Sequence, residues 1–322
     1  MLLTFEETVK LISEGKYLHL AGTEDLLKKL PKGNWIGGST EYFMARAGGK
    51  VTNKLIYINP YYYYDCFKIK TYDVESIADV TTDAYDNGFS ILILPFDSEI
   101  HKLYADKASE FDGMFMKNIA GWVSGINLGA SGQTPIAVNG LTGEVCTDKA
   151  VAMHVCVPDD KVVNISIVNI FSADENSPVI KFQEEGFEAK NCTINGEEVV
   201  FSEYLEQNGI DVKLPLIGDY AGAGVNVSFK AIGDDGIVSF YAPVFSNIEY
   251  RFAKPIDNYE EEFRQKLLEL KSTEAVFSCN CILNFLYGEL EDKHVDAFFG
   301  PITFGEVAYQ LVNQTLVYVT VS

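Results

Sequence analysis

The C-terminal stretch that decides the fold begins with Ala275-Val-Phe-Ser-Cys279, a short apolar run typical of a buried strand. It continues with the glycine-rich turn Gly300-Pro-Ile-Thr-Phe-Gly-Glu306. It ends with Gln314 to Val321, where β-branched residues alternate along an expected last strand. Residues 280–287 are expected to form a helix. This close succession of strand, helix, turn and strand favours a fold that mixes both kinds of element.

The rest of the chain repeats this mixture. Thr4-Phe-Glu-Glu7 is a capping box and predicts an N-terminal helix. Phe89 to Phe96 is largely apolar and predicts a central strand covered on both faces. Asn195-Gly196 and Asp234-Asp-Gly236 are typical of hairpin turns, which join antiparallel strands. The sequence therefore predicts an α+β fold with mixed, largely antiparallel sheets and packed helices.

The length of the chain indicates two lobes. Its 322 residues exceed what one ordinary core needs. The polar stretch Ser172 to Pro178 is the expected boundary, so we predict lobes at residues 1–175 and 176–322. Glycine-rich turns are expected at Gly33 to Thr40 and at Gly121 to Gly132.

Charge and composition exclude several classes of function. The net charge is −21, which repels nucleic acids and anionic membranes, and the chain has three arginines, Arg46, Arg251 and Arg264. It shows neither a secretory signal nor an apolar run long enough to span a membrane. We therefore expect a soluble, cytoplasmic protein that binds neither nucleic acid nor membrane, with its six cysteines reduced and mostly buried.

Motifs for common cofactors and catalytic groups are absent. The sequence contains no phosphate-binding Gly-x-x-x-x-Gly-Lys motif, no nucleophile elbow and no His-Glu-x-x-His zinc motif. Cys279 and Cys281 lack the further ligands that zinc needs. Tyr61 to Tyr64 is expected in a strand with two rings turned inward, and His19 is expected to be either partnered or exposed. We predict no cofactor and no metal.

Three C-terminal segments resemble the C-terminal domain of the FIST family in order and spacing. They are Glu274 to Asn280, Phe299 to Glu306 and Leu311 to Leu316. The turn at Asn195 to Glu198 is similar to the start of that domain, so the resemblance covers residues 179–322. The N-terminal half resembles the FIST N domain more loosely, through the two glycine-rich turns. The sequence of residues 33–38 is more similar to an uncharacterised bacterial FIST-like family than to the main branch of the FIST family.

The resemblance implies a sensory, signal-transducing protein that binds small polar ligands. Amino acids are the usual expectation for such domains, and a signalling protein is the expected partner. Because the chain leaves no room for an output domain, we expect a stand-alone binding protein.

The candidate ligand-binding residues lie in two groups. If the strand ending in Ser278, Cys279 and Asn280 is followed by a helix that Asn280 caps, the backbone amides there would suit a carboxylate. Glu306 could accept an ammonium group, and Tyr309 could cover an aliphatic part. The other candidates are Phe304, Gly305 and Asn313, with Trp35, Gly37, Gly38 and Thr40 on the opposite wall.

Structural explanations compete with each of these assignments. A plain cap explains Asn280, the first turn of a helix explains Glu306, and a turn anchor explains Trp35. Two other functions stay open as well. One is a hydrolase-like enzyme that uses Glu306 or Cys279, and the other is a ligand-free module that docks on a partner protein.

Overall fold

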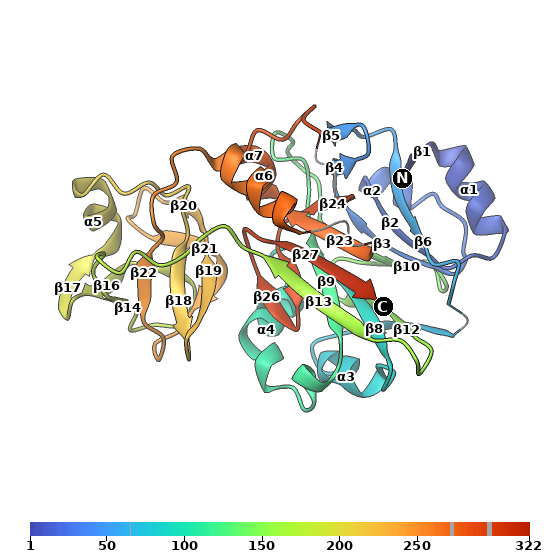
Figure 1. Cartoon of the computed structure of the whole chain (residues 1–322), viewed down its shortest axis with the longest axis horizontal. Coiled ribbons are helices and arrows are strands. Elements are labelled where there is room, and N and C mark those ends of the chain that lie inside the picture. Colours follow the sequence, from blue (N-terminus) through green and yellow to red (C-terminus); the bar gives the residue numbers. More distant parts are fainter. Residues whose placement is uncertain (65, 271–273, 295–297) are drawn as a thin grey trace.

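The computed structural model describes residues 1–64, 66–270, 274–294 and 298–322 (Figure 1). It consists of two bodies side by side. The smaller body (residues 180–252) lies at the left of Figure 1, and the larger body, which carries both termini, lies at the right. Strands and helices are mixed in both bodies, which confirms the expected α+β fold.

Three six-stranded sheets build the larger body. The first sheet contains, in order, β1 (Leu2–Leu3), β6 (Ile56–Pro60), β2 (Leu18–Gly22), β3 (Trp35–Ser39), β10 (Ala137–Asn139) and β11 (Glu144–Cys146). The second contains β26 (Gln310–Val312), β25 (Glu306–Ala308), β9 (Ile119–Ser124), β8 (Gly88–Pro95), β12 (Ala150–Cys156) and β7 (Phe67–Tyr72). The third contains β13 (Val163–Val168), β27 (Leu316–Val321), β23 (Ala275–Cys281), β24 (Gly300–Thr303), β4 (Tyr42–Ala45) and β5 (Gly48–Val51).

Two sheets face a common aromatic core in the smaller body. One contains β17 (Glu197–Val200), β16 (Asn191–Ile194), β14 (Ile180–Lys181), β22 (Tyr250–Phe252), β18 (Leu216–Tyr220) and β19 (Ala223–Val227). The other contains β15 (Gly186–Ala189), β21 (Val238–Val244) and β20 (Phe229–Ile232). Phe182 sits at the centre of this core, with edge contacts to the rings of Phe201, Phe240 and Tyr250.

The helices are short and cover the sheets from outside. They are α1 (Phe5–Ser13), α2 (Glu24–Leu27), α3 (Val80–Asp83), α4 (Glu99–Lys107), α5 (Phe201–Gln207), α6 (Tyr259–Glu269) and α7 (Ile282–Tyr287). The capping box at α1 is confirmed, because Thr4 and Glu7 exchange hydrogen bonds between side chain and backbone. Among the described residues, no helix is long and apolar enough to cross a membrane.

The C-terminal strands return to the N-terminal half of the chain. In the second sheet β25 pairs with β9, and in the third β27 pairs with β13 while β24 pairs with β4. Strand pairing therefore crosses the boundary expected between residues 175 and 176. The smaller body is an insertion into the larger one, and Ala173 and Ala253 form a β-bridge where the chain enters and leaves it.

The glycine-rich segments are partly strands. Residues 33–40 contain β3, which is fully buried, whereas in the second segment β9 ends at Ser124 and the expected turn follows, with the amide of Ala130 bonded to the carbonyl of Asn127. A Cβ at Gly38 would lie 2.7 Å from the ring of Trp122, so glycine here allows two sheets to pack closely. The expected turn at residues 300–306 is likewise wrong, because β24 and β25 replace it and no helix follows Glu306.

One pair of cysteines departs from the expected reduced state. Cys66 and Cys156 form a disulfide, with their Cα atoms 5.5 Å apart. It joins the start of β7 to the end of β12, which are antiparallel neighbours. The other four cysteines are free and buried, as expected.

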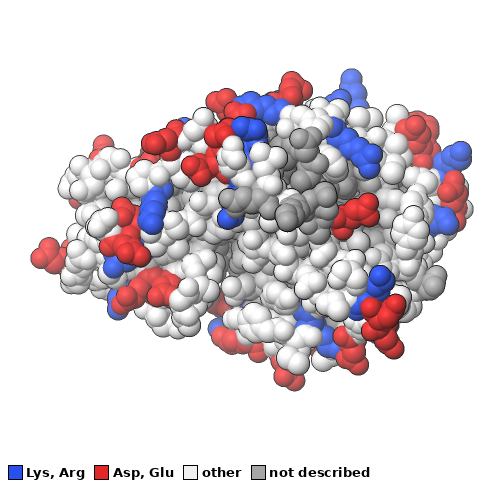
Figure 2. Space-filling view, viewed as in Figure 1, with Lys and Arg blue, Asp and Glu red and all other residues white. Residues whose placement is uncertain are grey.

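Acidic and basic side chains are mixed over both bodies on the face shown in Figure 2. The excess of negative charge is thus spread rather than gathered in one patch on that face. Such a surface gives no extended basic stripe there for a polyanion.

Candidate functional site

Glu306 lies at the start of β25 and is fully buried. The amide and the hydroxyl of Thr315 both donate to its Oε2, at 3.3 and 2.9 Å, and Thr303 Oγ1 lies 2.8 Å from Oε1. Burial raises the pKa of Glu306 to about 8, although these hydrogen bonds oppose the rise. At neutral pH it is a protonated acid among threonines, and it lines neither cavity described below.

The hydrogen bonds around Glu306 offer a place for its proton. Thr315 supplies two donors to Oε2, and the Thr303 hydroxyl is within donating distance of both Oε1, at 2.8 Å, and the carbonyl of Asn280, at 3.2 Å. When Glu306 is protonated on Oε1, it can donate to Thr303 while Thr303 donates to Asn280. This closed set of hydrogen bonds joins β23, β24 and β25.

The polar residues of β23 also point into the structure. Ser278 Oγ donates to the carbonyl of Phe299 at 2.9 Å, and Cys279 Sγ donates to that of Gly121 at 3.3 Å. Burial raises the pKa of the Cys279 thiol well above its usual value, which disfavours a thiolate nucleophile. Asn280 lies inside the strand and accepts from Asn284, so the expected helix cap at Asn280 is wrong.

Asn313 ties the larger body to the smaller one. Its Oδ1 accepts from the amide of Ser228, and its Nδ2 donates to the carbonyl of Asn226, both at 2.9 Å. Next to it, Gln314 accepts from Ser228 Oγ at 2.6 Å and donates to the hydroxyl of Tyr259 at 3.0 Å. These buried amides therefore hold β20, α6 and the start of β27 together.

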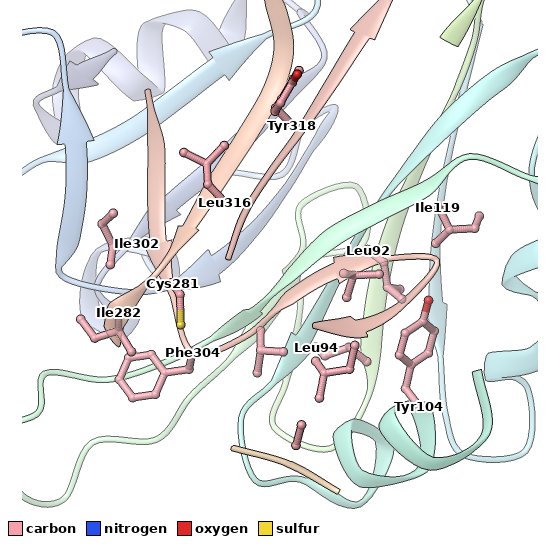
Figure 3. Close-up of a cluster of buried hydrophobic side chains, with 14 of the residues drawn as sticks. Leu92, Leu94, Tyr104, Ile119, Cys281, Ile282, Ile302, Phe304, Leu316 and Tyr318 are labelled. Carbon is pink, nitrogen blue, oxygen red and sulfur yellow. The ribbon is translucent and has the colours of Figure 1, made fainter. Parts of the chain in front are cut away.

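The remaining predicted residues pack in different parts of the core. The indole of Trp35 donates to the carbonyl of Pro31 at 2.9 Å, and its ring belongs to the cluster beneath α1. In Figure 3, the ring of Phe304 lies beside Ile282 in another cluster. Gly37 packs against Trp35, and Gly305 packs against Val123. The hydroxyl of Thr40 donates to the carbonyl of Ile302.

Tyr309 completes this group. Its ring lies 6.0 Å from that of Phe115, and its carbonyl accepts from the hydroxyl of Tyr104 at 2.6 Å. The structure thus brings Glu306, Asn280, Thr303 and Thr315 together but leaves Trp35 and Tyr309 elsewhere. Of the predicted residues, Ser278 alone lines the larger of the two cavities described below.

That cavity, which we call the His19 cavity, has a volume of about 1270 Å³. It lies between the first sheet and β23, with the end of α6 and the hairpin of β4 and β5 at its sides. His19, Tyr57, Asn59 and Tyr61 are among its lining residues. His19 pairs with Asn59 across the sheet, and Tyr57 and Tyr61 stand two residues to either side of Asn59. All four therefore project from one face of the sheet.

His19 carries an unpartnered donor within the wall of the cavity. The indole N–H of Trp122 donates to its Nε2, 2.9 Å away, so the neutral ring carries its hydrogen on Nδ1. Burial lowers the pKa of His19 to about 3, which keeps the ring neutral. Among the described residues, Nδ1 has no hydrogen-bond partner. The rings of Trp122 and Phe277 contact the imidazole edge-on and hold its orientation.

Tyr61 supplies a second such group. Its side chain is 4% exposed, and no described residue meets ordinary hydrogen-bond geometry with its hydroxyl. Burial raises the pKa of Tyr61, and a weak side-chain hydrogen bond from Asn59 to the phenol oxygen opposes that rise without cancelling it. The hydroxyl thus remains protonated and can donate. The expected strand at residues 61–64 is wrong, although Tyr61 and Tyr64 do turn inward against Phe89.

Arg46 stands at the rim of the same cavity, in the turn between β4 and β5. Its guanidinium lies 5.9 Å from the ring of Phe299 and forms no ion pair with a described residue. The other two arginines are engaged, since Arg251 donates to the carbonyl of Glu175 and Arg264 to the carboxylate of Glu261. Arg46 is thus the arginine available to a ligand.

Apolar surface surrounds the opening. Tyr63 is 90% exposed, Leu268 is 58% exposed and Tyr62 is 48% exposed, and all three line the cavity. A second cavity, of about 240 Å³, lies between α4 and the smaller body. Within residues 1–64, 66–270, 274–294 and 298–322, no group of three or more His, Cys, Asp or Glu side chains is arranged to hold a metal ion.

Sequence reasoning named Tyr61 and His19 but gave neither a site. The alternation of Tyr57, Asn59 and Tyr61 was the available signal, because it places three polar side chains on one face of a strand. Their meeting with His19 depends on the pairing of β6 with β2, which no local pattern encodes.

Comparison with known proteins places the chain in one family. No curated protein and no solved structure matches it. A family model, described as a family of unknown function (DUF6976), matches residues 3–322, a span that includes His19, Arg46 and Tyr61. The chain therefore belongs to the family of unknown function DUF6976.

Proposed function

We propose that this protein binds a small molecule in the His19 cavity. The observation that carries the proposal is the pair of buried, unpartnered polar groups on its wall, His19 Nδ1 and Tyr61 Oη. A buried polar group without a partner costs about 1–3 kcal/mol, so two of them on the wall of one cavity favour a bound partner. A bound molecule with an acceptor atom would satisfy both groups.

The size and chemistry of the cavity support the proposal. Its volume of about 1270 Å³ exceeds that of a typical drug-sized site, and its walls are mainly apolar, with a few polar groups that converge. The exposed rings of Tyr62 and Tyr63 at the opening would lose contact with water when a ligand covers them.

A sensory role, which the FIST resemblance implies, is part of the proposal. The C-terminal end of α6 reaches the cavity through Leu267 and Leu268. At its other end, the hydroxyl of Tyr259 bonds Gln314, which also bonds Ser228 of the smaller body. A ligand that shifts α6 would therefore act on the contact between the two bodies, where a partner protein could sense the change.

The test is a ligand screen on the purified full chain. Small acids, alcohols, amides, amines and amino acids are added at millimolar concentration, and the unfolding midpoint is measured. A ligand at a hundredfold excess over its Kd stabilises by about 2.7 kcal/mol, which is easily detected. Mass spectrometry of a solvent extract of the protein checks for a bound molecule that was purified with it.

Two matched variants locate the site. Tyr61→Phe removes only the buried hydroxyl and should weaken binding, whereas Tyr63→Phe removes an exposed hydroxyl from the same segment and should not. Ligand binding should also change hydrogen exchange at the amide of Ser228, which donates to Asn313. Failure of every class of compound to bind would refute the proposal, and binding without any change at Ser228 would refute its sensory part.

A further inference from the structure

We infer that the ligand of the His19 cavity is a carboxylate with an apolar body, of the kind found in aromatic and fatty acids. This inference rests on the proposed function and adds the chemical class of the ligand. Its first basis is the direction of the polar groups. His19 offers Nδ1–H and Tyr61 offers O–H, so the inner wall presents donors and calls for an acceptor.

The geometry of the sheet places these donors close together. His19 pairs directly with Asn59, and Tyr61 lies two residues further along the same face. The pairing continues past the end of β6, because the amide of Tyr61 donates to the carbonyl of Tyr17 at 3.0 Å. Diagonal neighbours of this kind have backbones roughly 7–8 Å apart, so the two side chains arise from the same part of the wall.

Asn59 is held by the opposite sheet. Its Nδ2 donates to the carbonyl of Val276 at 2.7 Å, so this amide serves to join the two walls of the cavity. Tyr57 is occupied in the same way, since its hydroxyl donates to the carbonyl of Phe299 at 2.7 Å. Along this face, the two donors without a partner are therefore those of His19 and Tyr61.

Arg46 supplies the positive charge that a carboxylate needs. Burial raises the pKa of the Tyr57 hydroxyl, and the positive charge of Arg46 lowers it. Arg46, Tyr57 and Tyr61 all line the cavity. Glu274 and Asp292 also line the cavity, but neither contributes to the shifted pKa of His19, Tyr57 or Tyr61.

The remaining walls suit an apolar body rather than a second charged group. Aromatic and aliphatic side chains line them, among them Leu2, Leu55, Ile58, Tyr64, Leu267 and Phe277. Burial of such a body supplies most of the binding free energy, while the carboxylate fixes its orientation. A ligand with a single charge at one end matches this arrangement.

The experiment measures Kd by calorimetry for matched probes on the full chain. The acids are 3-phenylpropionate and decanoate. The neutral analogues are 3-phenylpropanamide and decanol, and the charged alternatives are 3-phenylpropylamine and L-phenylalanine. We expect at least one acid to bind at least about tenfold more tightly than its neutral analogue, because charge-assisted hydrogen bonds are roughly twice as strong as neutral ones.

Variants then separate charge from hydrogen bonding. Arg46→Gln should weaken binding of the acid by about tenfold and leave the amide unchanged. Tyr61→Phe should weaken both, because the hydroxyl serves either oxygen. Arg264→Gln, which removes an arginine that pairs with Glu261 on the surface of α6, is the control and should change neither.

The outcomes distinguish the inference from the function on which it rests. Equal or tighter binding of the alcohol, the amide, the amine or L-phenylalanine would overturn the carboxylate inference while the cavity remained a binding site. Binding of no probe of any class, with water as the sole partner of His19 and Tyr61 in an experimental density map, would overturn the proposed function itself.

Discussion

The indole nitrogen of Trp122 lies 2.9 Å from Nε2 of His19 and donates its hydrogen to it. This one hydrogen bond decides which nitrogen of His19 carries the proton, and hence that a donor faces the cavity. It also joins the first sheet to the second, because His19 lies in β2 and Trp122 in β9.

The buried histidines should make the protein less stable in mild acid. Burial lowers the pKa from 6.5 to about 3 for His19 and to about 4 for His101 and His154. Below pH 6.5 the unfolded chain binds protons that the folded chain does not, so the free energy of unfolding falls as pH falls. The slope is up to about 1.4 kcal/mol per pH unit for each histidine.

Urea denaturation at a series of pH values between 4.5 and 7 measures how the free energy of unfolding falls in acid. His19→Gln should reduce the slope of the free energy of unfolding against pH by the contribution of one histidine, up to about 1.4 kcal/mol per pH unit. The control is Gln207→Asn, at an exposed position at the end of α5, which changes no titrating group and should leave the slope unaltered. A free energy of unfolding that does not change over this range would contradict the prediction.

Glu306 should produce a decline on the alkaline side. Its pKa is raised from 4.5 to about 8, so the folded chain holds a proton that the unfolded chain has lost. Stability is therefore lost as pH rises through this range and levels off above about pH 8. The histidines of the unfolded chain still lose protons between pH 6.5 and about 7.5 and partly offset this decline, so its slope stays below about 1.4 kcal/mol per pH unit.

Glu306→Gln should remove this decline. The amide offers an N–H toward Thr303 and an oxygen that accepts from Thr315, so it imitates the protonated acid. We expect the variant to match the parent near pH 4.5 and to exceed its stability by an amount that grows with pH up to about pH 8. Glu203→Gln, at an exposed position in α5, is the control. A parallel decline in Glu306→Gln and the parent would rule out this assignment.

Asn313→Ala should loosen the contact between the bodies. The change leaves the amide of Ser228 and the carbonyl of Asn226 buried without partners, which costs about 1–3 kcal/mol for each group. Hydrogen exchange at Ser228 should accelerate in proportion to this loss. Asn176→Ala alters an exposed asparagine and should leave the exchange rate unchanged.

The disulfide should stabilise the fold and restrict motion of the neighbouring tyrosines that line the cavity. Cys66 and Cys156 are 90 residues apart, and a link of this kind is worth about 2–5 kcal/mol. Reduction, or the double change of both cysteines to serine, should lower the unfolding midpoint. It should also weaken ligand binding, because the tyrosines at 61–64 end just before Cys66.

A count of the thiols that react with a thiol reagent in denaturant without reductant tests the disulfide directly. Four cysteines should react, and a count of six would disprove the Cys66–Cys156 disulfide.

The sequence was informative where local patterns decide the structure. The capping box at Thr4, the buried strand at residues 89–96 and the hairpin at residues 234–236 all depend on neighbours in the chain, and all three are confirmed. The last strand is also confirmed, as β27. In each case the signal is local hydrogen bonding or the period of the side chains.

It failed where distant segments meet. Gly38 and Gly125 were assigned to turns, yet they lie where the rings of Trp122 and Phe304 press against the backbone. The composition of a glycine-rich segment cannot distinguish a turn from a strand under another layer. The His19 cavity was missed for the same reason, because its walls come from parts of the chain far apart in sequence.

The bridge between Ala173 and Ala253 brings the two ends of the smaller body to one point. At the level of the gene, the intervening segment is therefore a cassette with adjoining ends. The strands of this segment pair only with one another within its own two sheets. Removal of the segment and joining of the chain near Ala173 and Ala253 should therefore leave the strand pairing around the His19 cavity unchanged.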